Sequence, residues 1–214
     1  MNAILYQSQP GGKKSNWAFQ YRGLISGVIL GSAFLVVLVS KPLISEGTWL
    51  DLAVDFLAWL AFVAGLVFRL WSTLYVGGRK CQIVVRDGPY SVCRNPLYLG
   101  SFLLALSAGL FLKSVLFAVF LGVAVLAYIL KTIPAEEAEL RRALGESYLD
   151  YCKQVPRFWP NFSLFKTPAT VEVTMHGLRI EAKRALVWIW LPFAGELVAH
   201  LRVEGWWPRI FNLL

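Results

Sequence analysis

Long apolar stretches separated by short polar segments dominate this chain. Residues 23–40 are uncharged, residues 50–76 carry few charges, and residues 97–112 and 114–130 are again uncharged. A helix that crosses a bilayer needs about 20 apolar residues, with a range of about 17–25. The third stretch is short alone, but residues 95–96 complete its first turn. The pattern therefore predicts four transmembrane helices.

A fifth apolar stretch, residues 185–201, is less regular. Pro192 interrupts it, and Glu196 and His200 add polar groups. Such a segment fits a crossing helix, a re-entrant segment or a helix lying in the interface. The sequence thus predicts an all-α, polytopic membrane protein with four to five transmembrane helices. We expect residues 1–214 to form a single integral-membrane domain.

The third and fourth apolar stretches are joined only around Lys113 and Ser114, so we expect an antiparallel hairpin. Small residues recur on both stretches at four-residue spacing, which lets membrane helices approach closely. We therefore predict that this hairpin is tight. The small residues are Ser101, Ala105 and Gly109 on the first helix and Ala118 and Gly122 on the second.

The polar segment after the hairpin has helical periodicity over residues 135–152. Pro134 suits a first helical turn or a kink. Acidic residues come first and Arg141 and Arg142 follow, in agreement with the helix dipole. We predict a cytoplasmic amphipathic helix. Its shared face contains Leu140, Leu144, Tyr148 and Tyr151.

Composition supports the membrane class, and charge adds an orientation. Of 214 residues, 57% are hydrophobic and 16% are charged, with a net charge of +8. Soluble domains usually carry more charge. Lysine and arginine concentrate before the first predicted helix and in segments 77–95 and 131–184. The positive-inside rule therefore places the N-terminus and both segments in the cytoplasm, and it explains the positive charge without a nucleic-acid partner.

Two polar clusters flank the predicted hairpin. Arg94 and Asn95 precede it, and Glu136 and Glu137 follow it. A hairpin returns the chain to the membrane face that it left, so these residues are expected to meet at one mouth. A guanidinium facing carboxylates suits a charged, water-soluble ligand. Simpler roles also exist: Arg94 as a headgroup anchor and Glu137 as a surface partner of Arg141.

Three charged residues lie near or within the predicted membrane depth, where charge is costly and often functional. Arg69 fits either a snorkelling side chain or the lining of a cavity. Asp51 and Asp55 lie near the outer end of their helix, where we expect a structural or interfacial role. We assign no role to the isolated histidines. The spacing of Cys81, Cys93 and Cys152 fits neither a metal site nor a disulfide framework.

The order and spacing of the two clusters resemble one family. These are the integral-membrane methyltransferases related to isoprenylcysteine carboxyl methyltransferase and phospholipid N-methyltransferases. The resemblance covers about residues 50–160, which leaves a C-terminal extension over about 161–214. The family often has Arg-His-Pro where this chain has Arg94-Asn95-Pro96. Asparagine can form hydrogen bonds but has no titratable imidazole, so we expect Asn95 to position a ligand rather than to act as an acid or base. The matching residues are Arg94-Asn95-Pro96-Leu97-Tyr98-Leu99-Gly100, then Glu136-Glu137-Ala138-Glu139-Leu140, Gly145, Tyr148, Tyr151 and Val155-Pro156-Arg157.

The resemblance implies S-adenosylmethionine as the cofactor and a lipid-like or prenylated small molecule as the methyl acceptor, with no metal. The cofactor would bind near the cytoplasmic face. Arg157 or Arg69 would act as the catalytic group that positions an anionic acceptor. The residues implied in cofactor binding are Arg94, Asn95, Pro96, Tyr98, Leu99, Gly100, Glu136, Glu137 and Tyr148.

Two alternatives belong to other classes. Membrane sterol reductases share a similar C-terminal helical core and bind NADPH at a comparable mouth. A non-catalytic membrane scaffold would keep the pocket shape without turnover. The pair Glu136-Glu137 followed by Gly145 and Tyr148 favours the methyltransferases. The identity of the acceptor and the oligomeric state stay open at this level.

Overall fold

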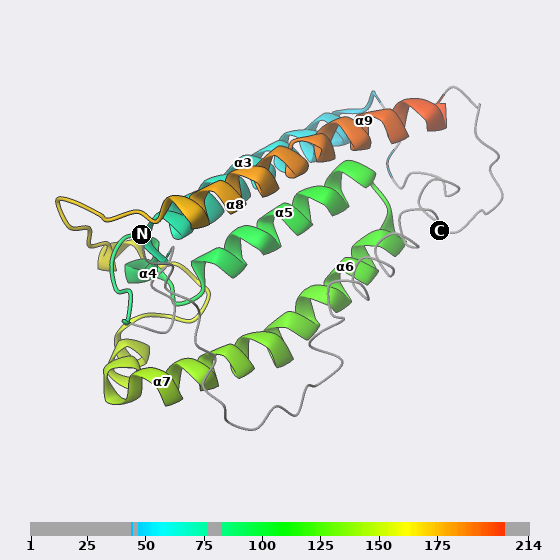
Figure 1. The fold of residues 1–214 in the computed structure, drawn as a ribbon. Coiled ribbons are helices and arrows are strands. Elements are labelled where there is room, and N and C mark those ends of the chain that lie inside the picture. Colours follow the sequence, from blue (N-terminus) through cyan, green and yellow to red (C-terminus); the bar gives the residue numbers. More distant parts are fainter. Residues whose placement is uncertain (1–43, 45–46, 77–82, 204–214) are drawn as a thin grey trace.

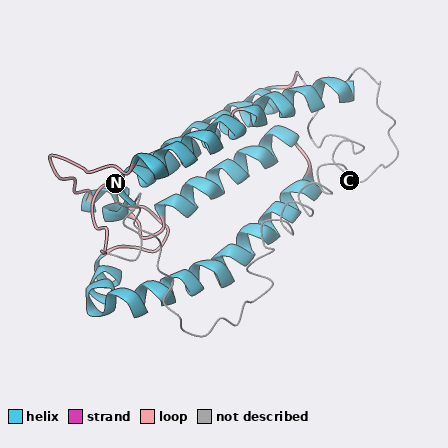
Figure 2. Cartoon of the chain, viewed as in Figure 1, coloured by secondary structure: helices cyan, strands magenta, loops and turns pink. Residues whose placement is uncertain are grey.

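The computed structural model describes residue 44 and residues 47–76 and 83–203. Within those ranges all regular structure is helical (Figure 2), so the all-α prediction is confirmed for them. The first predicted span, residues 23–40, lies outside the described residues, and so does Cys81.

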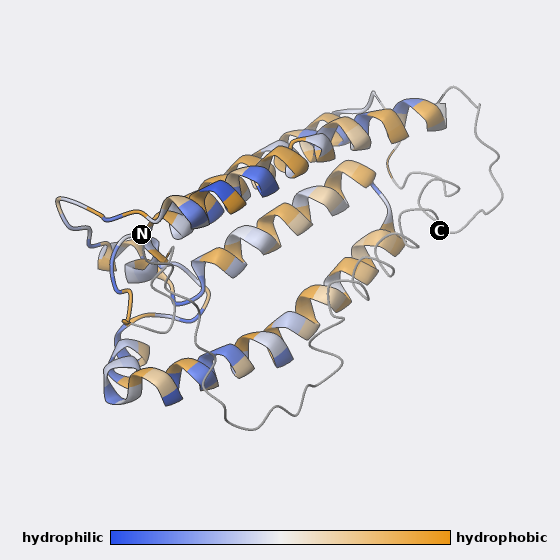
Figure 3. Ribbon diagram, viewed as in Figure 1, coloured by the Kyte–Doolittle hydropathy of each residue, from blue (hydrophilic) through white to orange (hydrophobic). Residues whose placement is uncertain are grey.

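The other three predicted spans form helices. They are α3 (Trp49–Val76), α5 (Pro96–Leu112) and α6 (Val115–Ala127). The stretches Trp49–Val76 and Val115–Gln154 are long and apolar enough to cross a membrane, whereas α5 is a shorter apolar helix. Apolar residues cover much of their surface (Figure 3), as expected where lipid replaces water. These features associate the chain with a membrane.

The expected polar helix is a direct continuation of α6. The chain passes through a π-helical turn, η1 (Tyr128–Thr132), into α7 (Ile133–Gln154). The N–H of Ile133 donates to the carbonyl of Tyr128, five residues back. This wider turn lies just before Pro134, which has no N–H to offer to an ordinary helical bond. α7 thus begins at Ile133, two residues before the predicted start at residue 135.

The closest helix packing lies between α3 and α5, which run side by side (Figure 1). A Cβ added to Gly100 would lie 2.7 Å from Cγ of Arg69 and 2.9 Å from the carbonyl oxygen of Gly65. A Cβ added to Gly65 would lie 2.8 Å from Cγ of Leu104. Glycine at both positions thus lets the two backbones approach. Next to this contact the core contains Ala58, Phe62, Leu104 and Phe111.

The prediction of a tight hairpin between α5 and α6 was wrong in its packing. The two helices are antiparallel neighbours, but they diverge from their short connection (Figure 1). A Cβ on Gly122 would meet nothing within 4 Å, and one on Gly109 would lie 3.6 Å from Leu121. An open apolar space, lined by residues of both helices, lies between them. The close contact of α5 is made with α3 instead, because Gly100 faces Gly65.

The fifth apolar stretch forms parts of two helices. These are α8 (Met175–Trp188) and α9 (Trp190–Val203), and the break falls at Ile189 rather than at Pro192. The two helices follow one another along α3 and α5 (Figure 1). Each has 14 residues, which is shorter than the roughly 20 that a crossing helix needs.

A buried ion cluster closes the connection between α5 and α6. The Lys113 ammonium contacts Asp51 and lies 2.9 Å from Oδ1 of Asp55, both on α3. Lys113 adopts a left-handed conformation (φ 47°) as it ends α5. This arrangement gives Asp51 and Asp55 a structural partner at the end of the bundle where α3 begins.

Candidate functional site

The polar clusters on either side of the hairpin meet at the opposite end of the bundle. They border an open pocket at the start of α5. The first turn of α5, the short helix α4 (Pro89–Val92) and α7 supply its walls. Six of the nine residues implied in cofactor binding line it: Arg94, Asn95, Pro96, Tyr98, Glu136 and Tyr148.

One wall of the pocket comes from the two halves of α7, which a kink at Gly145 (φ 54°, ψ −137°) separates, so the predicted continuous helix with one shared face was wrong. Leu140, Leu144, Tyr148 and Tyr151 all line the pocket. The hydroxyl of Tyr151 donates to the carbonyl of Tyr90 on α4 at 2.7 Å, which ties α7 to α4. The wall is therefore apolar and aromatic, and suits the flat face of a ring system.

Arg94 brings an unused donor to the pocket. Its backbone N–H is fixed by a 2.8 Å hydrogen bond to the carbonyl of Pro156. Its side chain lines the pocket, and the buried Nε has no hydrogen-bond partner among the described residues. Leaving such a donor unsatisfied costs about 1–3 kcal/mol, and more for a charged group. This orphaned donor favours ligand binding over a headgroup anchor.

Glu136 supplies the opposite charge. It lines the pocket from α7 and accepts a 2.6 Å hydrogen bond from the hydroxyl of Tyr98 on α5. The Tyr98 ring also lies 6.2 Å from the ring of Tyr128, measured between centroids. These contacts join α5 and the α6–α7 rod at the mouth. A pocket with a guanidinium and a carboxylate complements a zwitterionic ligand.

Glu137 lies behind the pocket wall, with only 5% of its side chain exposed. Its Oε1 accepts from Nδ2 of Asn95 at 3.0 Å and from Nε of Arg157 at 3.1 Å. Nη2 of Arg157 lies 3.1 Å from Oε2, so the two side chains form a bidentate ion pair. The sequence-predicted partner Arg141 lies farther away, at 3.9 Å. Glu137 is therefore placed to hold Asn95 and Arg157.

Asn95 is held by its amide group. Nδ2 donates to Glu137 and also, at 3.3 Å, to the carbonyl of Arg157. An amide offers two donors and does not titrate near neutral pH. These bonds keep the first turn of α5 against the segment after α7.

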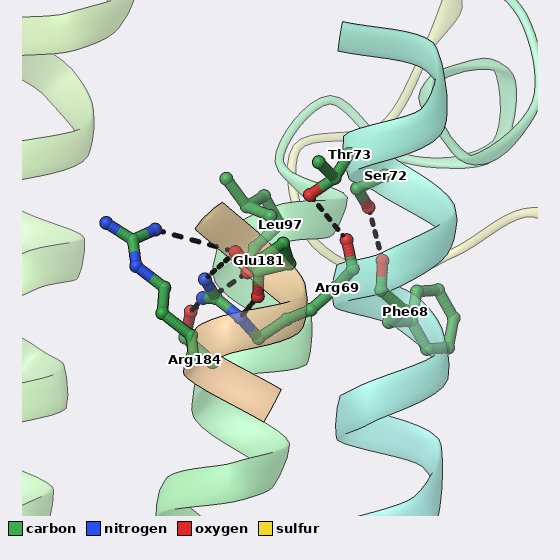
Figure 4. A network of polar contacts seen from close by, with 8 residues as sticks. Phe68, Arg69, Ser72, Thr73, Leu97, Glu181 and Arg184 are labelled. Atoms are coloured by element: carbon green, nitrogen blue, oxygen red, sulfur yellow. Dashed lines mark hydrogen bonds and ion pairs between the residues drawn. The ribbon is translucent and has the colours of Figure 1, made fainter. Parts of the chain in front are cut away.

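Arg69 does not line the pocket. Figure 4 shows it among α3, α5 and α8, with Nε 2.5 Å and Nη2 2.8 Å from the two carboxylate oxygens of Glu181. Nη1 donates to the hydroxyl of Ser101 at 2.5 Å. Only 4% of Glu181 is exposed. These contacts make Arg69 a buried clamp between helices rather than a group that faces the pocket.

Sequence reasoning missed Glu181 as the partner of Arg69, because no local pattern links positions 112 residues apart. The sequence also placed Leu99 and Gly100 in the cofactor site. The structure puts neither among the lining residues of the pocket, and Gly100 faces Arg69 and Gly65. Its lack of a side chain therefore serves helix packing.

Residues 156–167, which we call the strap, close over α4. Besides the Pro156–Arg94 bond, Asn161 N–H donates to the carbonyl of Val92 at 2.9 Å, and Gly88 N–H donates to the carbonyl of Lys166 at 2.7 Å. Gly88 has φ +59°, and an added Cβ would lie 2.3 Å from the Tyr75 ring. Sequence reasoning missed these contacts, because most of them involve backbone atoms.

Cys93 is buried beneath the strap. Burial raises the pKa of its thiol to about 11, partly offset by a backbone hydrogen bond and by Arg94. The thiol is therefore protonated at neutral pH and is a poor nucleophile. Across the part of the chain that the structure describes, no group of three or more histidine, cysteine, aspartate or glutamate side chains is placed to hold a metal ion.

Comparison with known proteins gives a family and two named relatives. A model of the phospholipid methyltransferase family matches residues 54–147, from α3 into α7, which confirms the resemblance seen in the sequence. The nickel-cobalt-cadmium resistance protein NccN of Alcaligenes xylosoxydans xylosoxydans is 28% identical over 86% of this chain and 86% of its own length. The cobalt-zinc-cadmium resistance protein CzcN of Cupriavidus metallidurans is 34% identical over 58% of this chain and 57% of its own. No solved structure matches the chain.

Proposed function

We propose that this chain is a membrane enzyme that transfers a methyl group from S-adenosylmethionine to a lipid-like acceptor, because residues 54–147 match the model of the phospholipid methyltransferase family. The observation that carries the proposal is that Arg94, whose buried Nε has no hydrogen-bond partner among the described residues, lines the same pocket as Glu136. The methionine end of S-adenosylmethionine carries a carboxylate and an ammonium. The pocket therefore offers a group of opposite charge to each.

The lining residues fit this cofactor by type. Arg94 would hold the carboxylate, and Glu136 would accept from the ammonium or the ribose hydroxyls. Leu144 and Tyr148 on α7 would cover the adenine ring with an apolar and aromatic face. Asn95, held by Glu137, would keep the start of α5 in place around the ligand.

When bound, the cofactor would supply an electrophilic methyl group. The work left to the chain is to orient the two reactants and exclude water. An uncharged amide at position 95 suits that task, since no strong acid or base is required. Arg157, 35% exposed and paired with Glu137, lies at the edge of the site and suits an anionic acceptor headgroup. Arg69 is buried in its ion pair with Glu181, so its guanidinium does not face the site where an acceptor headgroup would bind.

The proposed location is an integral membrane protein whose N-terminus and pocket mouth face the cytoplasm. The distribution of lysine and arginine supports it. The soluble cofactor would then arrive from water and the amphiphilic acceptor from the bilayer. The names of the two relatives describe resistance to metal cations. Such a name describes an outcome for the cell, so we propose metal resistance as the setting of the reaction and lipid methylation as its chemistry.

The proposal is tested by methyl transfer into lipid. Purified protein in detergent is incubated with methyl-labelled S-adenosylmethionine and a total lipid extract of its host, and the labelled product is identified by mass spectrometry. We expect label in one lipid class with the wild type and with Arg142→Ala, an exposed arginine on α7. Arg94→Ala should lose the label. Equal labelling by Arg94→Ala, or no labelled lipid from folded wild-type protein, would contradict the proposal.

A further inference from the structure

The strap exposes large aromatic side chains that the proposed pocket does not use. Trp159 is 88% exposed, Phe162 63% and Phe165 46%. Exposed apolar residues on α3, α5 and α6 are expected, because those helices face lipid. The strap is a loop with one short 3-10 turn, η2 (Phe162–Leu164), so this reason does not apply to it. Three exposed aromatic side chains within seven residues of one loop are more than the isolated apolar residues that any surface carries, and such a concentration is typical of an interaction site.

Basic residues flank these aromatics. Lys153 and Lys166 are exposed, and the Arg157 guanidinium lies 5.5 Å from the centroid of the Phe158 ring. No acidic residue occurs between Asp150 and Glu172. Aromatic rings mixed with cations are typical of segments at the headgroup level of a bilayer, where the rings enter the interface and the cations meet anionic lipid.

Contacts with α3 place the strap near the headgroup level of the bilayer. The ring of Phe165 lies 5.8 Å from the ring of Trp71, measured between centroids. The hydroxyl of Tyr75 lies 2.8 Å from Oγ1 of Thr167. Trp71 and Tyr75 belong to the last turns of α3, which ends at Val76. The strap therefore lies where this apolar helix leaves the hydrocarbon.

We propose that the aromatic part of the strap, residues 158–166, docks into the headgroup region of the same bilayer, with anionic phospholipid as its partner. The bilayer is favoured over a protein partner because the patch is continuous with a helix long and apolar enough to cross it.

Docking would also steady the pocket. The strap begins with Pro156, whose carbonyl holds the backbone N–H of Arg94. The next residue, Arg157, pairs with Glu137. A strap fixed by lipid therefore fixes two sides of the pocket wall. The docking itself does not depend on the nature of the ligand, so it stands or falls separately from methyl transfer.

The test places a polarity-sensitive dye on Phe162→Cys in a Cys81→Ser, Cys152→Ser background, in which only the buried Cys93 remains. The matched control is Thr170→Cys, an exposed polar position in the loop that leads to α8 (Figure 1). The protein is reconstituted in vesicles of phosphatidylcholine with phosphatidylglycerol. We expect spin-labelled lipid to quench the dye at position 162 and iodide to quench it at position 170. Equal quenching by iodide at both positions would overturn the docking.

A second measurement tests the lipid charge. Lys153→Gln combined with Lys166→Gln should remove the increase in lipid quenching that phosphatidylglycerol causes over phosphatidylcholine alone. Both lysines are exposed, and the ion pair of Lys153 with Asp150 is itself exposed, so we expect the fold to stay intact. The wild type and the double variant are compared at equal circular dichroism. Quenching that never depends on phosphatidylglycerol, or that depends on it equally in the lysine variant, would overturn the assignment of anionic lipid as the partner.

Discussion

At the residue scale the pocket depends on Arg94, the residue with a buried donor still unused. We predict that Arg94→Ala lowers the affinity for S-adenosylmethionine by roughly 10–100-fold, because a hydrogen bond to a charged group contributes about 1.5–3 kcal/mol. Equilibrium binding to detergent-purified protein measures this. Arg142→Ala, an exposed arginine on the same polar helix as Glu136, should bind as the wild type does.

The variant Glu137→Gln tests whether Glu137 contacts the cofactor directly or only holds Asn95 and Arg157 in place. The amide still accepts from Asn95 but loses the ion pair with Arg157. A smaller loss of affinity than in Arg94→Ala is therefore expected. Unchanged affinity in both variants would rule out this pocket as the cofactor site.

A residue-scale prediction with a pH dependence concerns Cys93. Burial raises the pKa of its thiol to about 11, whereas an unfolded cysteine has a pKa of about 8.5. In the folded protein iodoacetamide should therefore modify the less buried Cys152 at pH 8 and spare Cys93, as read by mass spectrometry. Between pH 8.5 and 11 the unfolded chain releases this proton first, so the contribution of Cys93 to stability falls as the pH rises. Rapid modification of Cys93 at pH 8 would contradict its burial.

At the element scale the glycines on α5 and α6 give a matched pair. An alanine methyl at Gly100 would meet Arg69 and the Gly65 backbone, so Gly100→Ala should destabilise by about 1–3 kcal/mol. Gly122→Ala meets nothing within 4 Å and should be neutral or stabilising through helix propensity. Thermal unfolding in detergent checks both. If Gly122→Ala destabilised the protein more than Gly100→Ala, the result would mean that α6, and not α3, packs closely on α5.

The buried pair Arg69–Glu181 is the second element-scale test, because it joins α8 to α3 and α5. Removing one partner of a buried pair leaves an uncompensated charge, which costs about 3–5 kcal/mol. Glu181→Ala should therefore lower the unfolding temperature sharply, and Arg69→Leu with Glu181→Leu should recover much of the loss. Glu196→Gln, an exposed position on α9, is the control. A mild effect of Glu181→Ala would exclude the clamp.

The helices were predictable because long apolar runs require them, and α3 and α5 match their runs to within a residue or two. Helix partners were less predictable, because small-residue spacing shows that a helix can pack closely but not against which neighbour. Gly100, for example, lies on a helix that was expected to pack closely on α6, but it packs against α3. Arg94 and Glu136 could be predicted to meet, and both line the pocket, because the chain marks them within short motifs. Glu181 and the strap could not, since their contacts are distant in sequence or made by backbone atoms.

At the scale of the whole molecule the two ends of the bundle differ. One end is closed by Lys113 with Asp51 and Asp55. The other holds the pocket, with charged groups at its mouth and apolar helices beside it. This asymmetry fits an enzyme that takes a soluble cofactor from one side of the membrane and an amphiphilic acceptor from the bilayer.

The most direct test of the central claim is the equilibrium binding of S-adenosylmethionine and of NADPH to the same folded, detergent-purified protein. The account predicts saturable binding of S-adenosylmethionine, lost in Arg94→Ala, and no displacement by NADPH. Binding of NADPH in the pocket in place of S-adenosylmethionine would indicate the reductase class. Binding of neither ligand to the folded protein would indicate a scaffold, and either result would contradict the account.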